Sequence, residues 1–338
     1  MTEKPDTRLH GEESIIQPFL APLAAGYPGA FGLLDDCAAI TPTPGHDLIV
    51  KTDPVAAGIH FLPDDAPEDI AWKALAVNVS DLAAKAAVPR AYLMALSFPE
   101  APTADWMRRF AKGLAEAQAV FGMHLIGGDT DRRPGPITIS ITAFGEVPAG
   151  RMVRRATARP GDRLYVTGTL GTASLGLQLR LDAKRGLALG LDAVTAAVAI
   201  DKYLRPQPRL ELRDVLRAHA CAAMDLSDGL AKDLRRMTAA SGCGSIVQLS
   251  NLPLSSAMTT AIGVEPVLWS TVVGGGDDYE LLIAVPPDQA TAFEAASANA
   301  STVFTVSHIG EMTTGPGVNF VDPQGRPFQP ARTGWDHF

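Results

Sequence analysis

Residues 221–234 read CAAMDLSDGLAKDL, where an apolar run ends at Asp225 and a helix-like pattern begins after Gly229. Asp225 and Asp228 stand three residues apart, with Ser227 between them. Serine and aspartate are both favoured at helix N-caps. The stretch is therefore explained equally well by a capped helix and by a turn whose acids bind a ligand, and the rest of the chain has to distinguish the two.

Strand-like and helix-like segments alternate on both sides of this stretch. Trp72, Leu75 and Val79 fall on one helical stripe, and residues 137–147 alternate in the manner of a strand. Helices are expected at residues 12–24, 67–88, 103–122 (with Thr103 as N-cap) and from about Thr172; strands are expected at 46–55, 90–99, 124–130, 137–147, 163–170 and 279–286, with a loop-rich tail after them. This alternation predicts an α/β or α+β fold.

The chain length favours two domains. A prior of roughly 150 residues per domain divides 338 residues into two. Residues 149–162, AGRMVRRATARPGD, are basic and contain proline and glycine, so they are interpreted as a connection. The predicted domains are residues 1–148 and 149–338.

Composition excludes several classes of protein. With 46% hydrophobic and 20% charged residues, the chain can bury a sizeable core. A net charge of −8 argues against a general nucleic-acid or anionic-membrane surface. Cys37, Cys221 and Cys243 have no metal-like spacing, and no apolar run reaches the roughly 18 residues of a membrane span. We expect a soluble, cytoplasmic protein that binds neither nucleic acid nor membrane.

Acidic residues recur where apolar segments end. The six stretches are LLDDCAAI (Asp35, Asp36), IVKTDPV (Thr52, Asp53), VNVSDLAAK (Ser80, Asp81), LIGGDT (Asp129), MDLSDGL (Asp225, Ser227, Asp228) and VVGGGDDYELL (Asp277, Asp278). Two unit charges about 4 Å apart repel by roughly 4 kcal/mol at an effective dielectric constant of 20, so a converging cluster requires cations. Oxygen ligands without a Cys/His pattern favour Mg²⁺, which commonly completes its shell with substrate phosphates.

Each stretch also has a structural explanation. Asp81 could lie on the solvated face of a helix, and Asp129 could be an ordinary turn residue. Three successive glycines before Asp277 cost backbone entropy, which makes a plain hairpin entry the weaker explanation there. The number and shared placement of the acids favour a common role.

Familiar catalytic signatures are missing. No GxxxxGK[ST] phosphate loop, GxGxxG fingerprint or GxSxG elbow occurs, and residues 168–176, GTLGTASLG, contain no lysine. Packing at a helix start is the favoured role for that glycine-rich stretch.

Together these stretches resemble the thiamine-monophosphate kinases, a family in the superfamily of aminoimidazole ribonucleotide synthetase and selenophosphate synthetase. The resemblance extends over nearly the whole chain through DDCA, TDPVAAGIHF, KALAVNVSDLAA, LIGGDT, RRATARPGDRLYVTGTLG, LRPQPR, MDLSDGLAKDL, GGDDYELL and GWDHF. It implies a two-domain fold of the aminoimidazole ribonucleotide synthetase type, and a homodimer whose N-terminal domains pair through their sheets. The first domain would bind ATP and Mg²⁺, and the second would complete the active site.

The resemblance also implies roles for individual residues. Several Mg²⁺ ions would be held by Asp36, Thr52, Asp53, Asp81, Asp129, Asp225 and Asp228. ATP would meet Gly128, Asp129, Arg155 and Ser227, with Arg154 as the alternative to Arg155. Thiamine monophosphate would be held by His60, Asp277 and Trp335. Taken alone, His60 could be a packed core histidine, Trp335 a packing aromatic and Arg155 a solvated linker charge.

Two positions depart from the family pattern. Leu34 stands where the family has a glycine before the two acids, which leaves the role of Asp35 relative to Asp36 open. Asp277 replaces a glutamate and is one methylene shorter, so its reach towards the substrate is reduced.

The implied reaction is ATP-dependent phosphorylation of thiamine monophosphate to thiamine diphosphate, the last step in making that cofactor. The substrate phosphate is already anionic near pH 7, so no general base is assigned; Asp228 and Asp129 would act through metal. The alternatives are another ATP-using enzyme of the superfamily, acting like aminoimidazole ribonucleotide synthetase on an amide oxygen, and a non-catalytic nucleotide-binding sensor.

Overall fold

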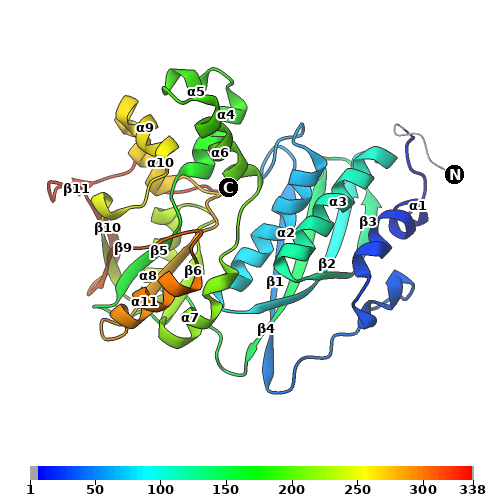
Figure 1. The fold of residues 1–338 in the computed structure, drawn as a ribbon, viewed down its shortest axis with the longest axis horizontal. Helices are drawn as coiled ribbons and strands as arrows, with labels where there is room; N and C mark the ends of the chain where they lie inside the picture. The colour runs from blue at the N-terminus through cyan, green and yellow to red at the C-terminus, as the bar shows by residue number, and fades with distance from the viewer. Residues whose placement is uncertain (1–6, 337–338) are drawn as a thin grey trace. The chain divides into compact units, whose positions relative to one another are not determined.

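The computed structural model of the chain describes residues 7–336. It contains two compact units, shown in Figure 1. Unit 1 comprises Met1–Leu82 and Ala87–Gly150, and unit 2 comprises Ala83–Ala86 and Arg151–Phe338. Within residues 7–336, no helix is long and apolar enough to cross a membrane.

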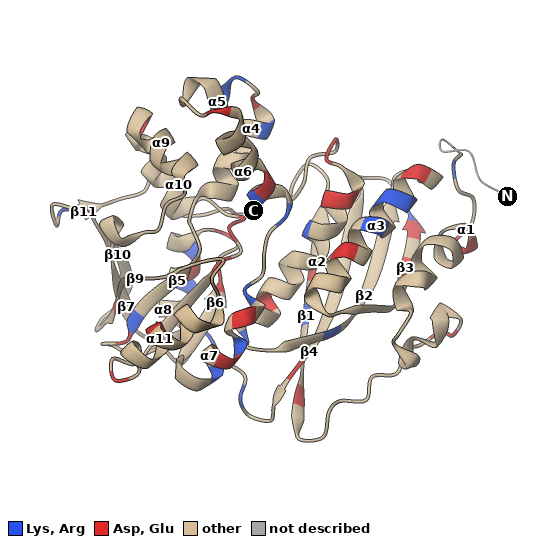
Figure 2. Cartoon of the chain, in the orientation of Figure 1, with Lys and Arg blue, Asp and Glu red and all other residues tan. Residues whose placement is uncertain are grey.

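Unit 1 is built on a four-stranded sheet in the order β1-β4-β2-β3. Its strands are β1 (His46–Ala56), β2 (Val88–Phe98), β3 (His124–Arg132) and β4 (Thr138–Pro148). Strands β2 and β3 run parallel, whereas β4 is antiparallel to both β1 and β2. Helices α2 (Pro67–Ala84) and α3 (Ala104–Phe121) lie over one face of the sheet, and both carry acidic and basic residues (Figures 1 and 2).

The two faces of this sheet are covered differently. On the helix side, Ile141 is fully buried and the Tyr92 hydroxyl donates to Gln118 Oε1 of α3 at 2.7 Å. On the opposite face, Thr142 and Phe144 are only partly buried. Because side chains alternate along a strand, one face of the sheet forms the core and the other retains polar groups near solvent.

The N-terminal segment does not form the single helix expected at residues 12–24. It is divided into α1 (Glu13–Ile15), the π-helical turn η1 (Ile16–Leu20) and the 3-10 turn η2 (Ala21–Ala24), followed by the 3-10 segment η3 (Pro28–Leu33). Pro18 and Pro22 lie inside the expected helix. Proline lacks a backbone N–H and clashes with the preceding turn, which explains the interruption.

Unit 2 is built on a seven-stranded sheet in the order β11-β10-β7-β9-β5-β8-β6. The strands are β5 (Arg163–Thr167), β6 (Ala222–Asp225), β7 (Gly244–Gln248), β8 (Leu281–Val285), β9 (Val306–Thr313), β10 (Gly317–Val321) and β11 (Pro327–Phe328). The helices are α4 (Thr172–Leu181), α5 (Arg185–Ala188), α6 (Ala193–Leu204), η4 (Leu210–Leu212), α7 (Arg213–His219), α8 (Leu230–Ser241), η5 (Leu249–Asn251), α9 (Ser256–Val264), η6 (Pro266–Leu268), α10 (Trp269–Gly274) and α11 (Ala290–Ala300). All pairings are antiparallel except that of β7 with β10.

The expectation of a loop-rich tail after residue 286 is wrong. Helix α11 and strands β9, β10 and β11 all lie in this part of the chain. Strand β9 pairs with β5 and β7, which lie far away in the sequence. Strand formation depends on such partners more than on local propensity, so the local pattern did not reveal these strands.

Gly113 provides a test of the helix packing in unit 1. A Cβ atom at this α3 position would lie 2.3 Å from the Glu68 carbonyl oxygen on α2, whereas one at Gly263 on α9 would meet nothing within 4 Å. We expect Gly113→Ala to lower the free energy of unfolding by about 1–3 kcal/mol, because the helices must separate. Gly263→Ala should raise it by up to about 1 kcal/mol through helix propensity. Urea denaturation of both variants measures this, and a stabilising Gly113→Ala would contradict the packing.

Candidate active site

Unit 1 contains a cavity of about 800 Å³ on the face of the sheet opposite α2 and α3. Asp36, on the segment before β1, lines it together with Gly128 and Asp129 from β3. Thr142 and Phe144 of β4 line it as well. Three of the residues expected to meet ATP or metal therefore share one cavity, and the volume is in the range of small-molecule sites.

The cavity has an apolar side as well as an acidic one. Ile16 and Leu20 of η1 contribute to it, as do Ile40 and Leu93. Such a combination suits a ligand with a flat apolar part and a charged part that is bound together with cations. No phosphate-loop motif is needed to build it.

Leu34 does not strain the loop that carries Asp35 and Asp36. Its φ is −105°, and its side chain is 79% exposed. Positive φ angles occur instead at Phe31 and Leu33, where a side chain costs conformational energy. Both Asp35 and Asp36 line the cavity, so the leucine does not distinguish between them.

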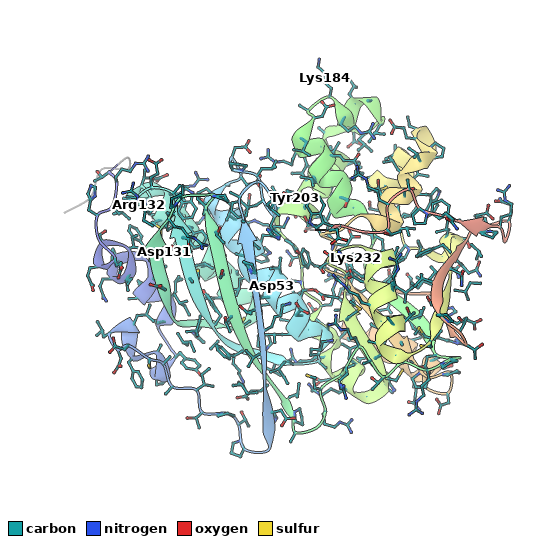
Figure 3. All side chains as sticks on the ribbon, turned by 180° about the vertical axis from the view of Figure 1, so that it is seen from behind. Asp53, Asp131, Arg132, Lys184, Tyr203 and Lys232 are labelled. Carbon is teal, nitrogen blue, oxygen red and sulfur yellow. The ribbon has the colours of Figure 1, made fainter. Side chains whose placement is uncertain are left out.

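A second acidic group in unit 1 is arranged around Lys51 of β1. The Lys51 ammonium lies 2.9 Å from Asp53 Oδ2 and 2.7 Å from Asp81 Oδ2 of α2. Burial acts to lower the pKa of Lys51, but Asp81 and Asp53 outweigh it and raise the pKa to about 12. The two carboxylates thus converge on one positive charge. Figure 3 labels Asp53 on its strand.

Thr52 points away from this group because neighbouring residues on a strand face opposite sides of the sheet. The Thr142 hydroxyl donates to Thr52 Oγ1 at 3.0 Å, and Thr142 lines the cavity. Thr52 therefore lies next to a residue that lines the cavity, whereas the carboxylate of Asp53 pairs with Lys51.

His60 lies in the turn after β1. Its Nδ1 accepts a hydrogen bond from the Ala56 backbone N–H at 3.1 Å. A ring nitrogen that accepts cannot carry a proton, so the neutral ring carries its proton on Nε2. The hydrogen bond from Ala56 thus orients the His60 ring relative to the main chain.

The loop between β6 and α8 in unit 2 excludes one of the two explanations of CAAMDLSDGLAKDL. Helix α8 begins after Gly229, and no side chain caps it. Instead, the backbone N–H groups of Ser227 and Asp228 both donate to Asp233 Oδ2, at 3.1 and 2.9 Å. The capping explanation for Ser227 and Asp225 is therefore wrong, because Asp233 satisfies this turn from within the helix.

Cationic side chains surround Asp228. Its Oδ2 lies 2.7 Å from Arg236 and 3.3 Å from Lys232, both on α8. Arg236 also pairs with Asp233 at 2.8 Å. Burial raises the pKa of Asp233 to about 6, with the charge of Asp228 also raising it. Sequence reasoning missed Asp233, Lys232 and Arg236, although all three lie within eight residues of Asp228.

The GGGDDYE loop packs against the same turn. The Asp277 backbone N–H donates to the Ser227 carbonyl at 2.9 Å, and that of Tyr279 donates to the Leu226 carbonyl at 2.8 Å. The Trp335 backbone N–H donates to the Asp228 carbonyl at 3.0 Å. Unit 2 thus brings Ser227, Asp228, Asp277 and Trp335 together, with Asp225 just before them at the end of β6.

Backbone conformation accounts for aspartate at position 277. Asp277 has a φ of 69°, in the left-handed region. Aspartate is enriched there because its short side chain can bond locally, and glutamate has no such advantage. The Tyr279 hydroxyl donates to Asp277 Oδ1 at 3.3 Å.

Sequence reasoning also missed a buried ionic group that joins two of the quoted motifs. Glu280, which follows GGDDY, is fully buried. Arg209, the last residue of LRPQPR, donates from Nε and Nη2 to its two carboxylate oxygens at 2.6 and 2.5 Å. Lys202 Nζ and the Thr167 hydroxyl donate to Glu280 at 2.5 and 2.6 Å. The available signal was a glutamate directly before the apolar run at residues 281–285.

The side chains of Arg154 and Arg155 are both exposed. Their main chain is held in place: the Arg154 carbonyl accepts from the Ala223 N–H at 3.2 Å, and the Arg155 carbonyl accepts from the Ser241 hydroxyl at 3.2 Å. The structure therefore does not distinguish Arg154 from Arg155 by exposure.

The proposed metal ligands do not form one preassembled cluster. Among residues 7–336, no three His, Cys, Asp or Glu side chains converge as a metal site. Their donors are carboxylate and hydroxyl oxygens, which fit Mg²⁺ rather than a softer metal. Two of these ligands, Asp53 and Asp81, already direct a carboxylate oxygen at one cation, the Lys51 ammonium.

Comparisons with known proteins identify the family. Residues 34–147 match the family model of the AIR synthase related protein, N-terminal domain. Residues 159–323 match the model of the AIR synthase related protein, C-terminal domain. The thiamine-monophosphate kinase of Caulobacter vibrioides is 42% identical over 325 residues, covering 95% of this chain and 89% of the relative. The chain belongs to the thiamine-monophosphate kinase family.

Solved structures of the family confirm the predicted fold. The thiamine-monophosphate kinase from Stenotrophomonas maltophilia K279a has a TM-score of 0.78 at 37% identity, covering 85% of this chain and 89% of that one. AaThiL complexed with AMPPCP and TMP has a TM-score of 0.76 at 30% identity, covering 92% and 97%. The two-domain fold expected from the family resemblance is therefore correct.

Glu280 provides a test of the buried ionic group. Burial acts to raise the pKa of Glu280, but Lys202 and Arg209 outweigh it and lower the pKa to about 2. Glu280→Gln should lower the free energy of unfolding at pH 7 by about 3–5 kcal/mol, because two cations lose their partner. The carboxylate contributes stability above its unfolded pKa of about 4.5 and loses it as pH falls towards 2.

Denaturation of both proteins between pH 7 and pH 3 measures this contribution. The difference between wild type and Glu280→Gln should shrink as the pH falls. Glu116→Gln, which removes the charge of the exposed Lys112–Glu116 pair on α3, is the control and should change stability by less than about 1 kcal/mol. A pH-independent difference for Glu280→Gln would contradict the ionic explanation.

Proposed function

We propose that this protein transfers the γ-phosphoryl group of ATP to thiamine monophosphate, giving ADP and thiamine diphosphate in the last step of making that cofactor. The family membership supports this, because the Caulobacter vibrioides relative carries the name of that kinase at 42% identity. The structure of AaThiL with AMPPCP, an ATP analogue, and TMP supports the same pair of substrates.

The cavity of unit 1 is the observation that carries the nucleotide assignment. It combines the acidic residues Asp36 and Asp129 with an apolar side formed by Ile16, Leu20 and Phe144. We assign the base to the apolar side and the phosphates to the acidic side. Gly128 exposes backbone in this cavity. We also assign Arg155, with Arg154 as the alternative, to the binding of ATP.

The unit 2 loops carry the substrate assignment. The Trp335 side chain is 49% exposed beside the Asp228 turn, and an aromatic face attracts a cationic ring such as the thiazolium of thiamine. Asp277 lies on the loop that packs against this turn, and His60 is the third residue that we assign to the substrate. These three residues would bind and orient thiamine monophosphate.

We assign the binding of Mg²⁺ to the carboxylates of Asp36, Asp53, Asp81, Asp129, Asp225 and Asp228, with Thr52. When bound, the ions offset the charge of the meeting phosphates and orient the attacking and leaving oxygens. The substrate phosphate oxygen forms the new bond to the γ-phosphorus, and the bond to the ADP oxygen breaks. Since the attacking oxygen is anionic near neutral pH, this chain needs no general base.

The proposal includes a homodimer that pairs through the unit 1 sheets. Strand β1 is an edge strand, and its Val50 side chain is 57% exposed. Val50 lies opposite Phe144 of β4, on the face that α2 and α3 do not cover. Pairing with a second copy would bury the exposed Val50 side chain. Sedimentation velocity of the full chain measures whether the protein is a dimer in solution.

The reaction itself is tested by ADP release. With Mg²⁺ and ATP, we expect turnover on thiamine monophosphate, thiamine diphosphate as the product, and loss of activity when EDTA removes the metal. Formylglycinamidine ribonucleotide tests the related synthetase reaction. Activity with that compound alone, or ligand binding without any turnover, would overturn the proposal.

Asp228→Asn tests the metal assignment. Removing a ligand charge should lower turnover by at least about 100-fold, because metal-supplied stabilisation of the transition state is worth several kcal/mol. The variant should remain folded and lose affinity for Mn²⁺, measured by electron paramagnetic resonance. Asp288→Asn, on an exposed loop after β8, is the matched control and should behave as wild type. Full activity of Asp228→Asn would contradict the assignment.

A further inference from the structure

The C-terminal segment, residues 331–336, is seated on unit 2 by backbone contacts. The Ala331 N–H donates to the Ser270 hydroxyl at 3.1 Å, and the Trp335 N–H donates to the Asp228 carbonyl at 3.0 Å. Gly334, between them, has a φ of 146°. A Cβ atom there would lie 2.5 Å from the Lys232 Cβ, so only glycine permits this close approach.

Lys232 fastens the other side of the same peptide segment. Its ammonium donates to the Trp335 carbonyl, and it lies 3.3 Å from Asp228 Oδ2 and 3.5 Å from Asp336 Oδ1. Lys232 stands on the first turn of α8, four residues after Asp228, and is labelled in Figure 3. Its side chain is only 19% exposed.

We propose that Lys232 is a positioning residue that fixes Trp335 beside Asp228 and thereby sets where the aromatic part of the substrate binds. The inference rests on the proposed function, in which Trp335 meets thiamine monophosphate. The N–H of Trp335 is held by Asp228 and its carbonyl by Lys232, so both backbone polar groups of that residue are anchored to one helix start. The main chain that carries the indole is therefore fixed before a ligand binds, which lowers the entropy cost of binding.

The oxygen partners of Lys232 favour positioning over direct phosphate binding. An ammonium group has three N–H donors, and three protein oxygens surround this one. A phosphate contact would have to displace one of them. Asp228 Oδ2 lies closer to Arg236, at 2.7 Å, than to Lys232, at 3.3 Å, so its carboxylate keeps a cationic partner when the charge of Lys232 is removed.

Two variants separate these roles kinetically. Lys232→Met keeps the apolar stem and removes the charge, and Lys232→Arg restores a charged donor. For Lys232→Met we expect the KM for thiamine monophosphate to rise about tenfold, as for loss of one charged hydrogen bond, with little change in kcat or in the KM for ATP. Lys232→Arg should recover most of the loss. Lys112→Met, an exposed position on α3, is the matched control and should be unchanged.

A double-mutant cycle tests whether the effect passes through Trp335. In a Trp335→Ala background, Lys232→Met should change the KM for thiamine monophosphate by less than about twofold, because residues that act together are not additive. If the increases in KM caused by Lys232→Met and by Trp335→Ala multiplied in the double variant, the proposal would be overturned. A raised KM for ATP together with a lowered kcat would overturn it in favour of direct phosphate binding.

A measurement without substrates keeps this inference separate from the proposed function. The chain has four tryptophans, so 5-fluorotryptophan labelling gives four fluorine resonances, and Trp335→Phe identifies one of them. Lys232→Met should shift and narrow the Trp335 resonance while leaving the other three in place. An unchanged Trp335 resonance would overturn the positioning role, even if the wild type turns over thiamine monophosphate. A wild type without turnover would refute the function but not the anchoring.

Discussion

The buried carboxylate of Glu280 is the constraint on which the unit 2 site depends. A fully buried charge is tolerated only when other groups compensate for its lost hydration, and here Arg209, Lys202 and Thr167 all do so. The Arg209 guanidinium also stacks over the Phe304 ring at 4.3 Å. Because Glu280 directly follows the Asp277 loop, this network anchors the end of the segment that packs on the Asp228 turn.

Lysine and arginine side chains already neutralise three of the acids expected to bind metal. Lys51 bridges Asp53 and Asp81 in unit 1, while Arg236 and Lys232 hold Asp228 in unit 2. Like charges can stand close together in a fold only when a counter-charge is present. These pairs orient the carboxylates, and they are the contacts with which a divalent ion would compete.

Much of the architecture could be predicted from the sequence. Hydrophobic periodicity located α2, α3 and the unit 1 strands, and Thr103 marked the start of α3. The prediction of one N-terminal helix is wrong because two prolines interrupt that segment. The strands after residue 286 were missed because their partner strands are distant in the chain. Local patterns reveal local hydrogen bonds, whereas sheet pairing depends on residues that sequence spacing does not bring together.

For the candidate site, the sequence predicted the chemistry from residue types: carboxylates at the ends of apolar segments, no softer ligand pattern, and motifs that resemble one kinase family. Only the tertiary structure decided how those residues are divided. In the structure, Thr52 faces the opposite side of the sheet from Asp53, and its hydroxyl accepts a hydrogen bond from Thr142. Asp233, and no side-chain cap, accepts the backbone N–H of Ser227, and Glu280 pairs with Arg209. The physical reason is that ligand and ion contacts are set by direction and distance, and these exist only once strands pair and helices pack.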